Sequence, residues 1–325
     1  MAIARSWRTG HHPDGPQQAR VEDIPALNQV FSDSFTERYR RDGLVGVRVP
    51  YLNPLIWRYA IEDAGAGALL WRDERGEIVA FNIVHGSGAE GWMGPLAVRP
   101  ESQGSGVGKD IVGSGIAWLQ RARATTIGLE TMPRTMDNIG FYSALGFVPG
   151  RLTITVTLDG AHADHAPLLL GKLGARDQVA ALEECRQLVD GVIPGYDFTR
   201  ELALTEELGL GDTVLFRTSG RLVGFALCHT APLVEGRSRE ETRVLKLVLA
   251  AGAGLRPAVI ALADYARRSG TRRVAFRTQT DYLEAYATLI ALGGRVRWTD
   301  LRMTLENYAE PLALDGALVW SNWEI

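Results

Sequence analysis

The chain has 325 residues, a length that predicts about two domains. Apolar residues make up 46% and charged residues 22%, which excludes a disordered, collagen-like or coiled-coil protein. The 35 basic and 38 acidic residues leave a formal charge of −3, so the bulk charge predicts neither a nucleic-acid nor a membrane partner.

The cysteines and the length of the apolar stretches indicate the cellular compartment. Cys185 and Cys228 form no CxxC pair and cannot build a disulfide framework. Residues 1–20 lack the apolar core of an export signal, and no apolar stretch is long enough to span a membrane. We therefore expect a cytoplasmic protein.

Hydrophobic periodicity in the first half predicts helices and strands that alternate along the chain. Helices are expected at residues 21–40, at a shorter segment before residue 63, at 107–123 and at 138–145. Strands are expected at residues 68–71, 78–84, 92–98, 126–131 and 152–158. A hairpin followed by a strand-helix-strand-helix-strand series predicts an α/β fold with a mixed sheet and helices on both faces.

The second half repeats this order. Gly76–Ile83 matches Gly220–Leu227, and Leu152–Leu158 matches Thr299–Leu305 at nearly the same offset. We infer two copies of one fold, at residues 1–160 and 161–325, followed by a tail that has no counterpart in the first copy. The alternative is two unrelated α/β domains that happen to share a similar β-turn-β pattern.

One segment of the first half, LAVRPESQGSGVGK at residues 96–109, predicts an anion site. A strand ends, a glycine-rich turn follows, and a helix begins at once, so free backbone N–H groups converge on one place. Gln103 and Asp110 depart from the nucleotide-binding P-loop at both ends, and Pro100 separates strand from turn, unlike a dinucleotide fingerprint.

The same segment resembles the acyl-CoA loop of the GNAT superfamily of N-acetyltransferases. The family pattern Gln/Arg-x-x-Gly-x-Gly/Ala is matched by Gln103, Gly106 and Gly108. A second family element, Asn-x-x-Phe-Tyr-x-x-Leu-Gly-Phe, is matched by residues 138–147. The resemblance covers residues 20–158 and implies two GNAT-like domains in tandem, the second of them degenerate.

The resemblance implies that acetyl-CoA is the co-substrate and that an amine attacks its thioester directly. The residues implied to bind acetyl-CoA are Leu96, Ala97, Val98, Gln103, Gly104, Ser105, Gly106, Val107, Gly108, Lys109 and Asn138. A backbone N–H near Val98 would face the developing oxyanion. Tyr142 would act as general acid, since a tyrosine of pKa about 10 can protonate a thiolate whose conjugate acid has a pKa near 8.5. Packing of a buried tyrosine beside Phe141 is the alternative.

The general base is less well defined by the sequence. Glu130, at the end of a predicted strand beside the cleft, is the first candidate, and a purely electrostatic carboxylate is the alternative. His85 could serve instead, although a lone histidine at a strand end is typical of a structural residue. Asp137 is interpreted as a charge in the first turn of a helix.

The second half departs from the family pattern, because Ala285 and Leu289 stand opposite Asn138 and Tyr142. We expect one active site, in the first half, and an amine acceptor that is a small molecule or a peptide. A non-catalytic acyl-CoA-binding sensor or scaffold is the alternative. No metal site is expected, since the HxxH spacing of His162 and His165 is only a weak metal signal. The tail offers an edge for pairing within the chain or in a homodimer.

Overall fold

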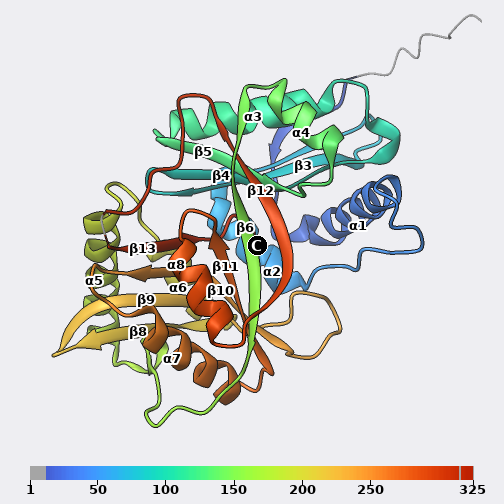
Figure 1. Ribbon diagram of the computed structural model, residues 1–325. Helices are drawn as coiled ribbons and strands as arrows, with labels where there is room; N and C mark the ends of the chain where they lie inside the picture. Colours follow the sequence, from blue (N-terminus) through green and yellow to red (C-terminus); the bar gives the residue numbers. More distant parts are fainter. Residues whose placement is uncertain (1–11, 315, 325) are drawn as a thin grey trace, which may run out of the picture.

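Helices cover both faces of a single mixed sheet, in which all thirteen strands of the described residues take part (Figure 1). The computed structural model describes residues 12–314 and 316–324. The strand order is β1-β2-β3-β4-β5-β12-β6-β11-β10-β9-β8-β7, and β13 pairs with β10 off this path. This mixed sheet with helices on both faces confirms the predicted fold class.

The elements of the first half follow the predicted order closely. The helices are α1 (Ile24–Arg41), α2 (Pro54–Ala64), α3 (Val107–Arg121) and α4 (Met136–Ser143), with short 3-10 turns at Val21–Asp23, Gly65–Gly67 and Pro100–Ser102. The strands are β1 (Asp14–Gln18), β2 (Ala68–Arg72), β3 (Ile78–Ser87), β4 (Glu90–Val98), β5 (Thr126–Thr131) and β6 (Phe147–Asp159). Strand β1 was not predicted, because its sequence DGPQQ carries no apolar alternation.

The second half repeats the same order of strands and helices. Its helices are α5 (Ala175–Val192), α6 (Thr199–Glu207), α7 (Leu255–Arg268) and α8 (Leu283–Ala291), with a 3-10 turn at Leu170–Lys172. Its strands are β7 (Leu168–Leu169), β8 (Gly211–Thr218), β9 (Arg221–His229), β10 (Glu241–Leu249), β11 (Arg273–Gln279), β12 (Arg295–Leu305) and β13 (Leu318–Ser321). The division at residue 160 stays a prediction; the loop there follows directly on β6.

Strand β6 of the first half and strand β12 of the second half exchange places. β6 lies between β12 and β11, and β12 lies between β5 and β6, so each strand has a neighbour from the opposite half (Figure 1). β6 pairs with β11 over seven residues, from Asp159 opposite Arg273 to Thr153 opposite Gln279. The two halves are therefore joined through one continuous sheet.

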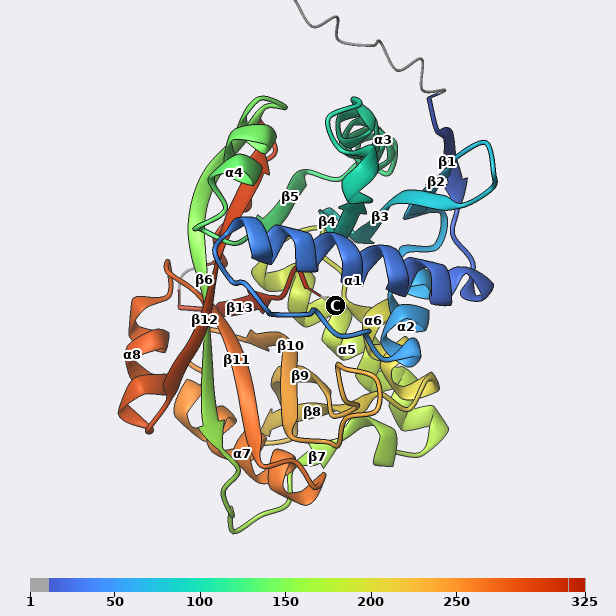
Figure 2. The same cartoon turned by 90° about the vertical axis from the view of Figure 1, so that its right-hand side faces the viewer.

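Helices pack on both faces of the first-half strands because alternate residues of a strand point to opposite sides. Phe81 of β3 packs with Ile56 and Trp57 of α2 on one face, and Val84 packs with Ile111 of α3 on the other. Helix α1 crosses the sheet between the first-half strands and the second-half strands (Figure 2). The space beside α1 is where the two halves meet.

Candidate active site

The glycine loop ends in a helix N-terminus that presents free backbone N–H groups. Gly104 and Gly106 have φ of 78° and 100°, values that residues with a side chain rarely adopt. Gly106 is the N-cap of α3 and has no side chain to cap the helix. Because the first N–H groups of a helix have no intrahelical acceptor, the loop forms the anion site that the sequence predicts.

Strand β4 bends away from β5 just before this loop. Two β4 residues, Gly94 and Pro95, lie opposite one residue of β3, which is the mark of a β-bulge. Pro95 has no N–H to donate to a sheet, and β4 pairs with β5 only from Glu90 to Met93. Among the described residues, the edge of β4 from Gly94 to Val98 that faces β5 therefore has no strand beside it.

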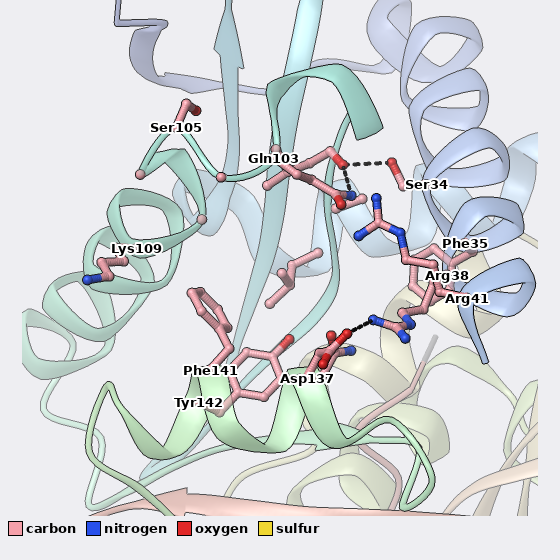
Figure 3. A pocket seen from close by; sticks show the side chains of 17 residues that line it. Ser34, Phe35, Arg38, Arg41, Gln103, Ser105, Lys109, Asp137, Phe141 and Tyr142 are labelled. Atoms are coloured by element: carbon pink, nitrogen blue, oxygen red, sulfur yellow. Dashed lines mark hydrogen bonds and ion pairs between the residues drawn. The ribbon is translucent and has the colours of Figure 1, made fainter. Parts of the chain in front are cut away.

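A cavity of about 760 Å³ opens between this edge, the glycine loop, α1 and α4 (Figure 3). Ten of the eleven residues predicted to bind acetyl-CoA line it: Leu96, Ala97, Val98, Gln103, Gly104, Ser105, Gly106, Gly108, Lys109 and Asn138. Val107 does not line it, because its side chain is buried in the core below the loop. The structure brings the predicted residues together, while the binding role of each stays a prediction.

Helix α1 supplies cavity residues that the sequence analysis missed. Ser34 Oγ and Gln103 Nε2 both donate to the backbone oxygen of Val98, at 3.1 Å and 3.0 Å. Arg38 pairs with Asp137 at 3.1 Å across the cavity mouth (Figure 3). The arginines at the end of α1 were the available sequence signal for these cavity residues. The sequence does not show that they face the cavity, because that depends on how α1 packs.

Tyr142 lies at the base of the cavity, on α4 (Figure 3). Burial raises the pKa of its phenol, so the group stays protonated at neutral pH. Its ring is held by edge contacts with Phe141 and Phe147, at centroid distances of 5.3 Å and 6.1 Å. Tyr142 can therefore donate a proton or a hydrogen bond from a fixed position.

Glu130 lies in a dense ionic cluster. It pairs with Arg277, receives a hydrogen bond from Arg302 Nε at 2.8 Å, and accepts another from Thr153 Oγ1 at 2.6 Å. Burial alone would raise its pKa, but the two arginines outweigh burial and lower the pKa to about 2. A carboxylate held this way is a weak proton acceptor, so the geometry disfavours Glu130 as the base.

The other sequence candidates for the base also lie in structural contacts. His85 is fully buried, stacks on Trp92 at 3.9 Å, and has its Nδ1 atom 2.5 Å from Asp63. It lines neither this cavity nor the second one described below.

The second half has a strand where the first half has the open edge. β13 pairs with β10 over Lys246–Leu249, the stretch that leads into the turn at 250–254. Trp320 of β13 packs against Phe276 in the core, at a centroid distance of 6.1 Å. Within the described residues, the tail thus fills the space beside β10 that stays open beside β4.

Other site types find little support in the described residues. No group of three or more His, Cys, Asp or Glu side chains is arranged there to hold a metal ion. Cys185 and Cys228 are both buried free thiols. Over residues 12–314 and 316–324, no helix has the length and hydropathy to cross a bilayer.

Part of the sequence and the whole fold are similar to known proteins. The family model described as "Acetyltransferase (GNAT) family" matches residues 26–147. A comparison with curated proteins finds no match. A candidate acetyltransferase from Pyrococcus horikoshii has a similar fold, with a TM-score of 0.67 at 15% identity, covering 99% of this chain and 98% of the other.

Two further solved structures share the fold over most of their length. A GCN5-related N-acetyltransferase from Sphaerobacter thermophilus has a TM-score of 0.56 at 16% identity, covering 89% of this chain and 94% of the other. A tandem GNAT protein from the clavulanic acid biosynthesis pathway has a TM-score of 0.57 at 14% identity, covering 92% and 98%.

The fold and the glycine loop define a GNAT-type acyltransferase architecture. Residues 26–147 match the GNAT acetyltransferase family model, and the chain as a whole has the fold of a tandem GNAT protein. The resemblance drawn from the sequence motifs is confirmed. The family uses acyl-CoA, generally acetyl-CoA.

Proposed function

We propose that the protein transfers the acetyl group of acetyl-CoA to a primary amine, at one active site in the first half. The observation that carries this proposal is the cavity in which the glycine loop, the open edge of β4 and Tyr142 meet. Each of these parts suits a different portion of an acyl-CoA molecule. The alternative, a sensor or scaffold, would also bind acyl-CoA but would not transfer the acyl group.

The glycine loop suits the pyrophosphate. The N–H groups between Gln103 and Gly108 would bind its oxygens, helped by the positive end of the α3 dipole. Arg41, which also lines the cavity at the end of α1, adds positive charge near an anion. Asn138 is close enough to Thr131 for a 3.4 Å hydrogen bond, and its amide can turn to the pantetheine arm instead.

The open edge of β4 suits the pantetheine arm. The arm has amide groups that can pair with backbone groups of Leu96–Val98 as an added strand would. This pairing would place the thioester at the β4 bulge, beside Leu96 and Tyr142. Tyr142 would then protonate the departing thiolate.

Calorimetry and a free-thiol assay on the Tyr142→Phe variant test this proposal. We expect the wild-type protein to bind about one equivalent of acetyl-CoA per chain and to release CoA when an amine is present. Tyr142→Phe should lower kcat about 100-fold or more, with little change in the Kd of acetyl-CoA, because only proton donation is lost.

Tyr308→Phe is the matched control, because Tyr308 binds Gln120 away from both cavities. Equal turnover by wild type and Tyr142→Phe would contradict the acid role. Binding of acetyl-CoA with no transfer to any of a broad set of amines would favour the sensor instead. A wild-type protein that binds no acetyl-CoA would reject both.

A further inference from the structure

A second cavity, of about 520 Å³, lies between the two halves and joins the first at the reacting end. Leu96, Asn138 and Tyr142 line both cavities. An acceptor must reach the thioester from a side that the CoA molecule leaves free. The second cavity provides that approach.

Both halves build the walls of this cavity, and much of the wall is apolar. The apolar and aromatic residues include Phe31, Phe35, Leu129, Leu233, Trp298 and Trp323. Trp323 is buried, and its indole nitrogen donates to Glu90 at 2.8 Å, which fixes the ring. Rigid apolar walls favour a ligand with an apolar body, because its burial removes apolar surface from water.

Carboxylates of both halves meet on one side of the cavity. Arg277 Nη2 is 3.0 Å from Asp300 Oδ2, Arg277 Nη1 is 2.7 Å from Glu324, and Arg277 also pairs with Glu130. Glu130 has a second cation, Arg302, which is itself shared with a further carboxylate. Three carboxylates, Glu130, Asp300 and Glu324, therefore share the positive charge of Arg277.

Asp300 differs from Glu130 in what holds it. Its Oδ1 accepts a 3.1 Å hydrogen bond from the Trp298 indole, and within the described part of the chain its one ion pair is with Arg277. The side chain is 12% exposed. It is therefore buried and directed by one contact from its own strand, β12, and one from β11, without the two cations that neutralise Glu130.

We propose that Asp300, from the second half, accepts the proton of the acceptor's ammonium group, and that the acceptor is a primary amine on an aromatic or branched aliphatic body. This inference rests on the proposed acetyl transfer. An ammonium group suits the carboxylates that share Arg277, and the apolar body suits the walls. The second half thus contributes a catalytic residue although it lacks the open edge that binds the cofactor.

The proton and bond changes balance. Asp300 accepts one proton from the ammonium group, which leaves a lone pair on nitrogen. The nitrogen forms the C–N bond at the thioester carbonyl, the C–S bond breaks, and Tyr142 protonates the thiolate. The phenolate takes the second proton from the new amide nitrogen, and Asp300 releases its proton to solvent.

The electrostatic surroundings of Asp300 support this role. Burial raises its pKa, Arg277 opposes the rise, and Glu324 and Glu130 add to it, with a resulting pKa of about 7. The other charged or titratable groups that line the cavity are Arg38, Tyr39, Tyr142, Glu241 and Arg243. Arg134 lies over the rings of Tyr39 and Trp298, at 5.9 Å and 5.7 Å. A base with a pKa near the working pH can both take and release a proton.

Asp300→Asn with 2-phenylethylamine as the probe amine tests the proposal. We expect kcat/KM to fall about 100-fold with the Kd of acetyl-CoA unchanged. In wild type, kcat/KM should fall as the pH drops below about 7, because Asp300 becomes protonated. The variant should lack this limb of the pH profile. Asp281→Asn is the control, since Asp281 pairs with Arg151 outside both cavities.

A second variant keeps the test decisive if Asp300→Asn does not fold. Trp298→Phe removes the indole donor to Asp300 and retains an aromatic wall, so the limb should move to higher pH because the carboxylate loses a stabilising hydrogen bond. An unshifted limb in Trp298→Phe, or full activity in Asp300→Asn, would overturn the role of Asp300.

The acceptor class is tested separately with spermidine and a lysine-containing peptide. Higher kcat/KM for either of these than for 2-phenylethylamine would overturn the apolar-amine assignment and leave the acetyl transfer intact. A wild-type protein that binds acetyl-CoA but acetylates none of these amines would reject the proposed function itself, and this inference with it.

Discussion

Arg277 is the residue on which the charges between the two halves depend. It contacts Glu130 of β5, Asp300 of β12 and Glu324 of the tail, and it is almost fully buried. Burying one arginine among three carboxylates stabilises the negative charge of the carboxylate with the most donors, which is Glu130. Glu130 is thus a structural anion, and the neighbouring Asp300 is left able to titrate.

Glu130→Gln should therefore destabilise the protein. Removing one partner of a buried ion pair leaves Arg277 and Arg302 less well compensated, so we expect a loss of about 3 kcal/mol in the free energy of unfolding at neutral pH. Because folding lowers the pKa of Glu130 from 4.5 to about 2, its contribution is complete above pH 4.5 and is lost as the pH falls toward 2.

Urea unfolding at neutral pH and through this acid range measures both effects. The difference between wild type and Glu130→Gln should shrink as the pH falls. Glu306→Gln, at an exposed position just after β12, should match wild type at every pH. A variant as stable as wild type at neutral pH would show that Glu130 is not held as the ion pairs indicate.

At the scale of elements, the difference between β4 and β10 decides where a cofactor fits. The sequence predicted β4 as a strand at residues 92–98, whereas it gave no residue range for β10. It also placed the glycine loop and the start of α3, because turn and helix signals are local. The pairing of β13 with β10 could not be predicted, because the tail is distant in sequence and its four-residue strand has no alternating pattern.

Gly106→Ala tests whether the loop conformation serves binding. An alanine Cβ at Gly106 meets nothing within 4 Å, so the obstacle is only the positive φ. The exposed free loop can relax to a negative φ, and binding must then restore the strained form at a cost of about 1 kcal/mol. We expect the Kd of acetyl-CoA to rise about five-fold.

Gly113→Ala is the matched control, because Gly113 lies within α3, is exposed, and has equally open space around it. This variant should keep the Kd of wild type and gain slightly in stability, since alanine favours a helix over glycine. An unchanged Kd of acetyl-CoA in Gly106→Ala would contradict this prediction, because it would show that binding does not need the positive φ at Gly106.

At the scale of the whole molecule, the sequence predicted the repeat but not how the copies combine. Matching apolar positions in Leu152–Leu158 and Thr299–Leu305 predicted β6 and β12. Their exchange between the halves could not be predicted, because the periodicity of a strand does not specify its neighbours. For the same reason the second cavity was missed, since Asp300 and Glu130 approach each other only through the pairing of β12 with β5.

The exchange predicts that the protein unfolds as one unit. β6 and β12 each lie against strands of the opposite half, and the first-half cores include Met303 and Trp323 of the second half. Phe276→Ala, which removes a fully buried ring from the second-half core, should cost about 3–5 kcal/mol. We expect it to shift one transition that far-UV circular dichroism and loss of acetyl-CoA binding report together, because unfolding of the second half removes β12 from beside β5. Two separate transitions, with acetyl-CoA binding retained through the first, would contradict this coupling.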